Sequence, residues 1–167
     1  MKIGVDATPL TIPFPCGTRH YSEQLLGNLA KIDNKNQYII FASKKVSIPN
    51  QANFKFVKIP SFIPVLKRQL FLASYISREK VDVFHNLEPY GAIFFKHPRI
   101  ITTVHDLNLK LTYPILSKRF LNRLYCEIAR RGVFKNTKTF ITMSSTIKKE
   151  LVLFLKKLNK KAEIEVI

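Results

Sequence analysis

The sequence predicts an α/β fold built on a doubly wound, mainly parallel sheet. Short runs of Val, Ile and Phe alternate with longer stretches in which apolar residues recur at helical spacing. One short run, 38–42, is continuously apolar, as expected of a strand that is buried on both faces. Strands that alternate with helices form βαβ units with right-handed crossovers. We therefore expect a Rossmann-like sheet with helices on both faces.

The strands and helices follow from these patterns in chain order. The expected strands are 2–7, 38–42, 54–59, 81–85, 99–105, 139–143 and 162–167. The expected helices are 18–32, 64–79, 115–133 and a last one that runs to residue 158 and is capped by Ser144 or Ser145. In the third helix, periodicity places Phe120, Leu121, Leu124 and Ile128 in the core, while Lys118, Arg119, Arg123 and Arg130 face elsewhere.

Length and composition predict one folded domain over residues 1–167. The 167 residues are 46% apolar and include 13 Phe and 6 Tyr, which is enough for one core and unlike a disordered chain. We find no internal repeat or linker. Cys16 and Cys126 are far apart and outside any metal-ligand spacing. We therefore expect free thiols in a reducing compartment and no metal site.

Ligands of such sheets bind beyond the carboxyl ends of the strands. The segments at those ends are 7–17, 85–91, 105–114 and 144–145. Because parallel strands end on the same edge, we expect the loops after Ala7, His85 and His105 to converge on one cleft. The turns G-x-G-x-x-G and G-x-x-x-x-G-K-[ST] are absent, which disfavours NAD, FAD and P-loop functions.

Five segments resemble a known family in their order along the chain. They are KIGVDATPL from Lys2, GTRHY from Gly17, DVFH from Asp82, TVHDL from Thr103 and SSTIKKEL from Ser144. In this order they resemble the N-terminal domain of the retaining glycosyltransferases of family four, especially its mannosyltransferase-like branch. The resemblance covers essentially the whole chain.

The resemblance implies an enzyme of two facing Rossmann-like domains, the GT-B fold. This chain matches the first domain, on the acceptor side, while the E-x7-E motif of the C-terminal, donor-binding domain is absent. The implied ligands are a GDP- or UDP-sugar donor and a sugar or lipid-linked acceptor, with no further cofactor. A donor-binding domain in cis or in trans is the implied partner. We expect a role in polysaccharide or glycolipid synthesis and no competence of the chain alone.

The same resemblance assigns site residues near the reacting sugar. His105 would lie beside that sugar, where a neutral imidazole can hydrogen-bond a hydroxyl or stabilise developing charge. Asp106 would orient His105 or contact the acceptor. His85 and Asn86 would line the acceptor cleft, and Ser144 would bind substrate. Without the resemblance, a His-Asp pair after a strand is more often a local turn, and a histidine ending a core strand is more often structural.

The family's glycine-rich loop corresponds to the start of the first helix. Gly17 would let the loop approach the donor diphosphate at the helix N-terminus, with Thr18, Arg19 and Tyr21 in the same segment. The sequence departs from the family there, since Cys16 and Arg19 take two glycine places and His20 takes the basic one. Arg19 could either contact phosphate or block the site. Alternatively, Gly17 simply makes the turn.

The charge of the chain is strongly positive. Lys and Arg number 28 against 11 Asp and Glu, a net charge of +17, which predicts attraction to nucleic acid, an anionic lipid surface or a phosphorylated substrate. The excess is greatest after Lys110. Asp6 interrupts the N-terminal apolar run, so we expect no signal peptide and a cytoplasmic protein, either free or peripheral on the cytoplasmic face of the membrane. The alternatives are a basic non-catalytic module for nucleic acid or membrane, and a non-catalytic transferase subunit.

Overall fold

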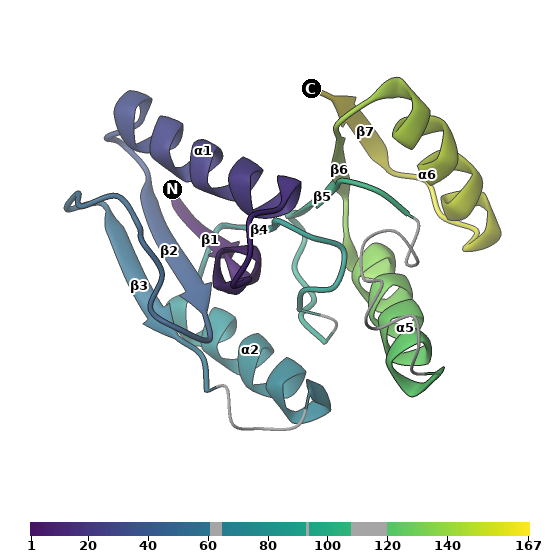
Figure 1. The fold of residues 1–167 in the computed structure, drawn as a ribbon, viewed down its shortest axis with the longest axis horizontal. Helices are drawn as coiled ribbons and strands as arrows, with labels where there is room; N and C mark the ends of the chain where they lie inside the picture. The colour runs from purple at the N-terminus through teal and green to yellow at the C-terminus, as the bar shows by residue number, and fades with distance from the viewer. Residues whose placement is uncertain (61–64, 93, 108–119) are drawn as a thin grey trace.

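The structure is a computed structural model that describes residues 1–60, 65–92, 94–107 and 120–167. Within these residues, a 7-stranded parallel sheet has the order β3-β2-β1-β4-β5-β6-β7 (Figure 1). The strands are β1 (Lys2–Asp6), β2 (Gln37–Ala42), β3 (Phe54–Lys58), β4 (Val83–Asn86), β5 (Ile100–Val104), β6 (Thr139–Thr142) and β7 (Glu163–Val166). This confirms the predicted α/β class and its parallel, doubly wound sheet.

Four α-helices and one short 3-10 helix lie in the described part of the chain. They are η1 (Thr8–Thr11), α1 (Gly17–Ile32), α2 (Val65–Glu79), α5 (Phe120–Asn136) and α6 (Ser145–Lys157). The expected loop 8–17 thus contains a turn of helix, which begins at Thr8 with Pro9 in its first turn. The expected start of the third helix at residue 115 lies outside the described residues.

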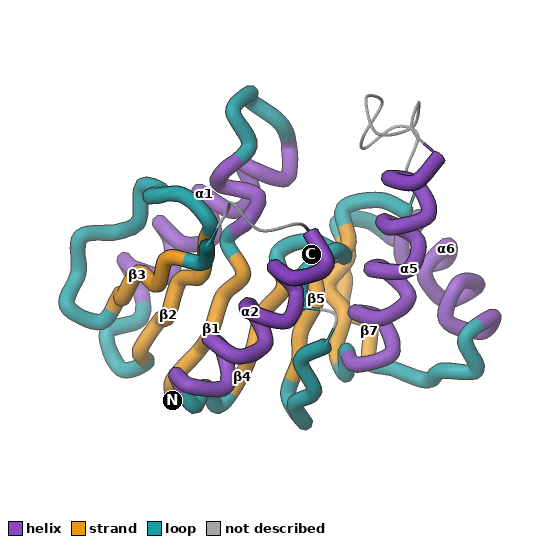
Figure 2. The backbone as a smooth tube through the Cα atoms, turned by 90° about the horizontal axis from the view of Figure 1, so that it is seen from below, coloured by secondary structure: helices purple, strands orange, loops and turns teal. Residues whose placement is uncertain are grey.

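The direction of each crossover decides which face a helix covers. The connection from β1 to β2 through α1 runs toward the β3 edge, whereas the connections through α2, α5 and α6 run toward the β7 edge. Right-handed crossovers in opposite directions lie on opposite faces. Accordingly α1 packs on Val5, Tyr38 and Ile40, while α2 packs on Phe41 and Phe84. Figure 2 shows α2 and α5 on the face opposite α1.

Helices α5 and α6 share a core with β5 and β6. Its buried members are Val104, Val133, Phe134, Phe140, Leu151 and Leu155. The ring of Phe134 contacts those of Phe140 and Phe154 edge-on, at centroid distances of 5.0 and 5.5 Å. This contact joins the two helices to each other and to the sheet.

The predicted orientation of the third helix is wrong. Leu124 and Ile128 are 47% and 56% exposed, whereas Arg130 is only 6% exposed. The guanidinium of Arg130 lies 4.5 Å from the centre of the Phe154 ring. The reason is that Val133, Phe134 and Cys126 occupy the inner side of α5, which turns Leu124 and Ile128 outward. The side chains of Lys118 to Arg123 lie outside the described part.

Candidate functional site

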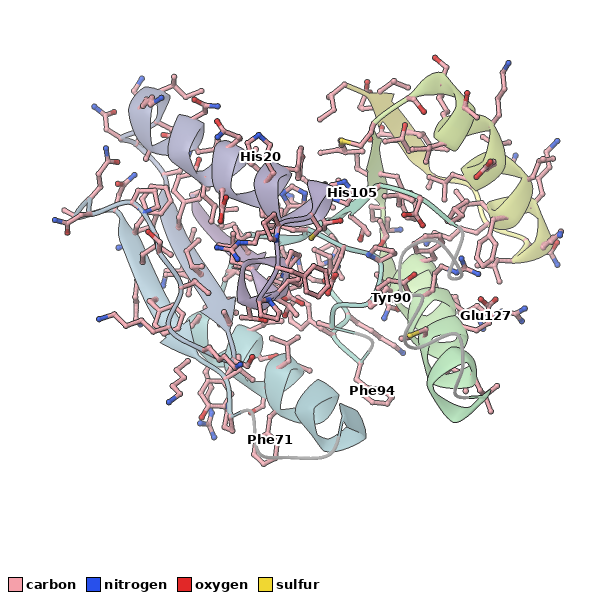
Figure 3. The ribbon with its side chains drawn as sticks, viewed as in Figure 1. His20, Phe71, Tyr90, Phe94, His105 and Glu127 are labelled. Atoms are coloured by element: carbon pink, nitrogen blue, oxygen red, sulfur yellow. The ribbon has the colours of Figure 1, made fainter. Side chains whose placement is uncertain are left out.

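The carboxyl ends of β1, β4 and β5 lie next to one another at the centre of the sheet. Strand β4 pairs with β1 on one side and with β5 on the other. His85 Nε2 lies 2.8 Å from Thr103 Oγ1, and His105 Nε2 lies 3.1 Å from the Leu87 carbonyl oxygen. The predicted adjacency of these strand ends is therefore confirmed, while their convergence on one cleft stays a prediction. Figure 3 shows His105 beside the first turns of α1.

His105 has a defined orientation and protonation state. Its Nε2 donates to the Leu87 carbonyl, since a carbonyl oxygen only accepts, and its ring meets Tyr21 edge-on at 5.0 Å between centroids. Burial lowers the pKa of His105, opposed by the Leu87 hydrogen bond and the charge of Asp106. The ring is thus neutral at pH 7, and Nδ1 is left as a hydrogen-bond acceptor. Such an imidazole can hold a hydroxyl group.

His85 is a second neutral imidazole one strand away. Burial and the neighbouring His105 lower the pKa of His85 to about 4. Its hydrogen bond with Thr103 joins β4 to β5. His85 shares a sheet row with Val5, under α1, and with Ile101 on β5. It therefore lies on the α1 face, at the border of the area that α1 covers.

Asn86 faces the opposite side of the sheet. It is buried, donates from Nδ2 to Thr102 Oγ1 at 3.2 Å and accepts at Oδ1 from the Ala92 backbone at 3.3 Å. Gly91 lies so close above it that an added Cβ would be 2.1 Å from Asn86 Oδ1. These contacts place Asn86 as a support of the 87–92 connection, which carries the Leu87 partner of His105.

The start of α1 is open and uncapped. Its N-cap, Cys16, makes no side-chain cap hydrogen bond, and no acidic residue lies in the first turn. Gly17 does not have a positive φ, and a Cβ added to it meets nothing within 4 Å. The turn therefore does not need glycine, which removes the simplest structural reason for Gly17. The first N–H groups of an α-helix lack partners within the helix and attract anions.

Arg19 is held beside this helix end by the protein itself. Its Nη1 donates to the Ile12 carbonyl at 2.9 Å and its Nε to Glu23 at 2.8 Å. Together with Pro15, Cys16 and His20, both side chains line an open cavity of about 460 Å³. Arg19 thus forms the wall of a cavity rather than a plug over the helix N-terminus.

The remaining site residues predicted from the sequence have defined positions. Ser144 is the N-cap of α6, as expected, and its Oγ accepts from the Ile147 backbone at 3.2 Å. It lies at the carboxyl end of β6, one strand beyond His105. The carbonyl of Thr18 accepts from the buried Ser22 hydroxyl at 2.8 Å. Asp106 follows His105 directly, where its negative charge favours the imidazolium form.

A buried polar cluster beside α5 was not predicted. Arg130 Nη1 donates to the Leu107 carbonyl at 2.6 Å, and Nη2 binds Glu127. Glu88 is buried, and burial raises the pKa of Tyr90, whose electrostatic neighbours include Arg130 and Asp106. Arg130 therefore holds the segment that follows His105. The sequence offered one sign of this cluster, the acidic residue Glu88 directly after a buried strand. No sequence pattern distinguished Arg130 from the other basic residues of its helix.

No group of three or more His, Cys, Asp or Glu that could hold a metal ion occurs in the described residues. Cys16 and Cys126 are free thiols, as expected. Within the same ranges, no helix has the length and apolar character needed to cross a bilayer.

No family model matches the chain, and no curated protein matches it.

Proposed function

We propose that this chain is the acceptor-side half of a retaining nucleotide-sugar glycosyltransferase. The observation that carries the proposal is the position of His105. It is a neutral imidazole at the carboxyl end of a central strand, with Nε2 fixed by Leu87 and Nδ1 left to accept from a hydroxyl. A sugar has the hydroxyl groups that such a site binds. The resemblance of the five segments supplies the reaction class.

The open start of α1 complements His105. Gly17 leaves its backbone accessible, and the helix N-terminus favours the negative charge of a diphosphate. Tyr21, in the second turn of α1, contacts the His105 ring, and this contact supports the proposal that the helix end and the imidazole belong to one site. We assign Gly17 and Thr18 to binding of the donor phosphates. We assign His85 and His105 to the part of the site that holds the sugar. A separate donor-binding domain would complete the enzyme, and the chain alone would not transfer sugar.

An anionic membrane surface is the proposed location of the acceptor. Several large apolar side chains are exposed on α2, on the connection after β4 and on α5, namely Phe71, Phe94, Leu124 and Ile128. Figure 3 shows Phe71 and Phe94 projecting on the same side of the molecule. Combined with the net charge of +17, these side chains favour peripheral binding to anionic lipid.

The test uses the purified chain and two donors, GDP-mannose and UDP-glucose, followed by NMR and by a transfer assay. We expect weak binding with negligible transfer, and shifts confined to the start of α1 and the residues around His85 and His105. Gly17→Ala should leave the fold intact, because its Cβ meets nothing within 4 Å, but should reduce the shifts. His105→Ala should abolish them, whereas the control His97→Ala, on the connection that enters the amino end of β5, should not.

Tight binding or sugar transfer by the purified chain would refute this division of labour. A basic binding module is the second candidate function, favoured by the net charge of +17. Selective binding to a defined oligonucleotide near physiological salt, not displaced by anionic vesicles, would support that module and contradict the membrane proposal. Retention of nucleic acid at low salt would not separate the two, because phosphate contacts are then strong for any basic surface.

A further inference from the structure

One row of side chains crosses the sheet from a covered half to an uncovered half. The strand register aligns Ile40, Val5, His85, Ile101, Thr139 and Glu163 in this row, on the α1 face. Ile40 and Val5 lie under α1 and are 0% and 2% exposed. The next three residues are only partly buried, and Glu163 is exposed. No described helix lies over the β4–β7 half of this face.

The opposite face of the same strands is closed. There Phe84, Ile100, Thr102 and Phe140 are buried beneath α2, α5 and α6. Parallel sheets are normally covered on both faces, so a half-exposed face with Val83, Ile101 and Ile141 is unusual. As far as the described residues go, this face is therefore open to a ligand.

The uncovered face contains an open depression at the amino ends of the strands. Its volume is about 690 Å³, within the range of small-molecule sites. The floor is apolar, with Val83 and Ile101 from the sheet and Pro98 and Ala162 from the preceding loops. It lies at the opposite ends of the strands from His105 and Gly17, and the inference does not depend on the proposed transferase function.

The rim of the depression is basic. Arg99, Lys138 and Lys161 line it, against one carboxylate, that of Glu163. Glu163 accepts from Thr139 Oγ1 at 3.2 Å, and among the described residues none of the three cations forms an ion pair. Nearby, burial and, after it, the charge of Lys138 lower the pKa of Lys160, so Lys138 and Lys160 repel each other. A bound anion would relieve the repulsion.

We infer that this depression, lined by Val83, Pro98, Arg99, Ile101, Lys138, Thr139, Lys161 and Ala162, binds an organophosphate with an apolar body. The phosphate lies among Arg99, Lys138 and Lys161, which donate charge-assisted hydrogen bonds. The apolar body lies on Val83, Ile101 and Ala162, where it removes exposed hydrocarbon from water. The site recognises both parts, which distinguishes it from a general attraction of phosphate to a basic protein.

The experiment is an NMR titration of the full chain with octyl phosphate, below its micelle-forming concentration, and with inorganic phosphate. We expect octyl phosphate to bind about tenfold or more tightly than inorganic phosphate, because several methylene groups leave water. Shifts should centre on Val83, Ile101 and Ala162. The double variant Lys138→Glu/Lys161→Glu should weaken binding of both probes by about tenfold or more, since it removes two charged donors.

Two variants make the test specific. Lys44→Glu/Lys45→Glu makes the same change of charge at exposed lysines after β2, so it should alter binding by no more than about twofold. Ile101→Ala should weaken octyl phosphate by about threefold and leave inorganic phosphate unchanged, because it removes only apolar contact area.

Vesicles of dioleoylphosphatidylcholine and dioleoylphosphatidic acid form the last arm. Free organophosphate is supported as the source if octyl phosphate binds and the vesicles cause no shifts in the depression. A lipid headgroup is supported as the source of the phosphate if the chain binds the vesicles and the variant Lys138→Glu/Lys161→Glu abolishes that binding. The inference is wrong if octyl phosphate binds no better than inorganic phosphate, or if the Lys44/Lys45 variant weakens binding equally.

Discussion

Two isoleucines in one row of the sheet have different surroundings. Ile40 lies under α1 and is completely buried, whereas Ile101, on the same face, is only partly buried. Both belong to runs of strand-forming residues, so their local sequences are alike. The difference arises from the chain's crossovers, which place one of the described α-helices on the α1 face and three on the other. Burial on this face thus depends on topology more than on residue type.

The most direct test compares Ile40→Ala with Ile101→Ala. We expect Ile40→Ala to lower the free energy of unfolding by about 2–5 kcal/mol, because it leaves a cavity under α1. Ile101→Ala should lower it by about 1 kcal/mol or less, because water can replace the lost contacts. Urea unfolding of the two variants and the wild type measures both values. Equal losses would show that the β4–β7 half of this face is covered in solution.

His85 lies at the border between the covered and uncovered halves and makes stability depend on pH. Its folded-state pKa of about 4 lies below the unfolded value of about 6.5, so protons bind preferentially to the unfolded chain. The contribution of His85 is present above about pH 6.5 and is lost as the pH falls toward 4. The loss should reach up to about 3 kcal/mol.

Urea unfolding between pH 7 and pH 4 measures this slope, and NMR titration of the His85 ring measures its pKa. His85→Gln should flatten the slope, since glutamine does not titrate in this range. An imidazole that titrates near 6.5 would instead show that water reaches the His85 ring in the folded protein.

The smallest expected effect concerns the closed face and two arginines that share Glu127. Arg130 is buried and also holds Leu107, whereas the side chain of Arg131 is 58% exposed. Arg130→Met should cost about 2–3 kcal/mol, because it leaves the Leu107 carbonyl without a donor and removes one of the two arginines that bind Glu127. Arg131→Met should cost less than about 0.5 kcal/mol. Thermal unfolding gives both values; similar small losses would show that Arg130 is hydrated in solution.

Much of the fold could be predicted because its signals are local. The apolar run 38–42 lies in β2, and Ser144 is the N-cap of α6, both as predicted. Periodicity also identified the apolar stripe of α6, in which Leu151 and Leu155 are buried. It misjudged α5, where Leu124 and Ile128 are spaced like core residues but face outward. A helical stripe identifies an apolar side, whereas packing against neighbours decides which side turns inward.

The candidate site, like the fold, could be predicted from the sequence only in part. Strand order along the chain was enough to expect that His85 and His105 meet, because parallel strands end on one edge. The sequence alone thus determined the parallel α/β sheet, the strand ends that carry these histidines and the excess of positive charge. Only the tertiary structure decided that Asn86 turns to the opposite face, that Arg130 is buried, and that no described helix covers the β4–β7 half of the α1 face. These features depend on contacts between residues distant in sequence, on which local spacing carries no information.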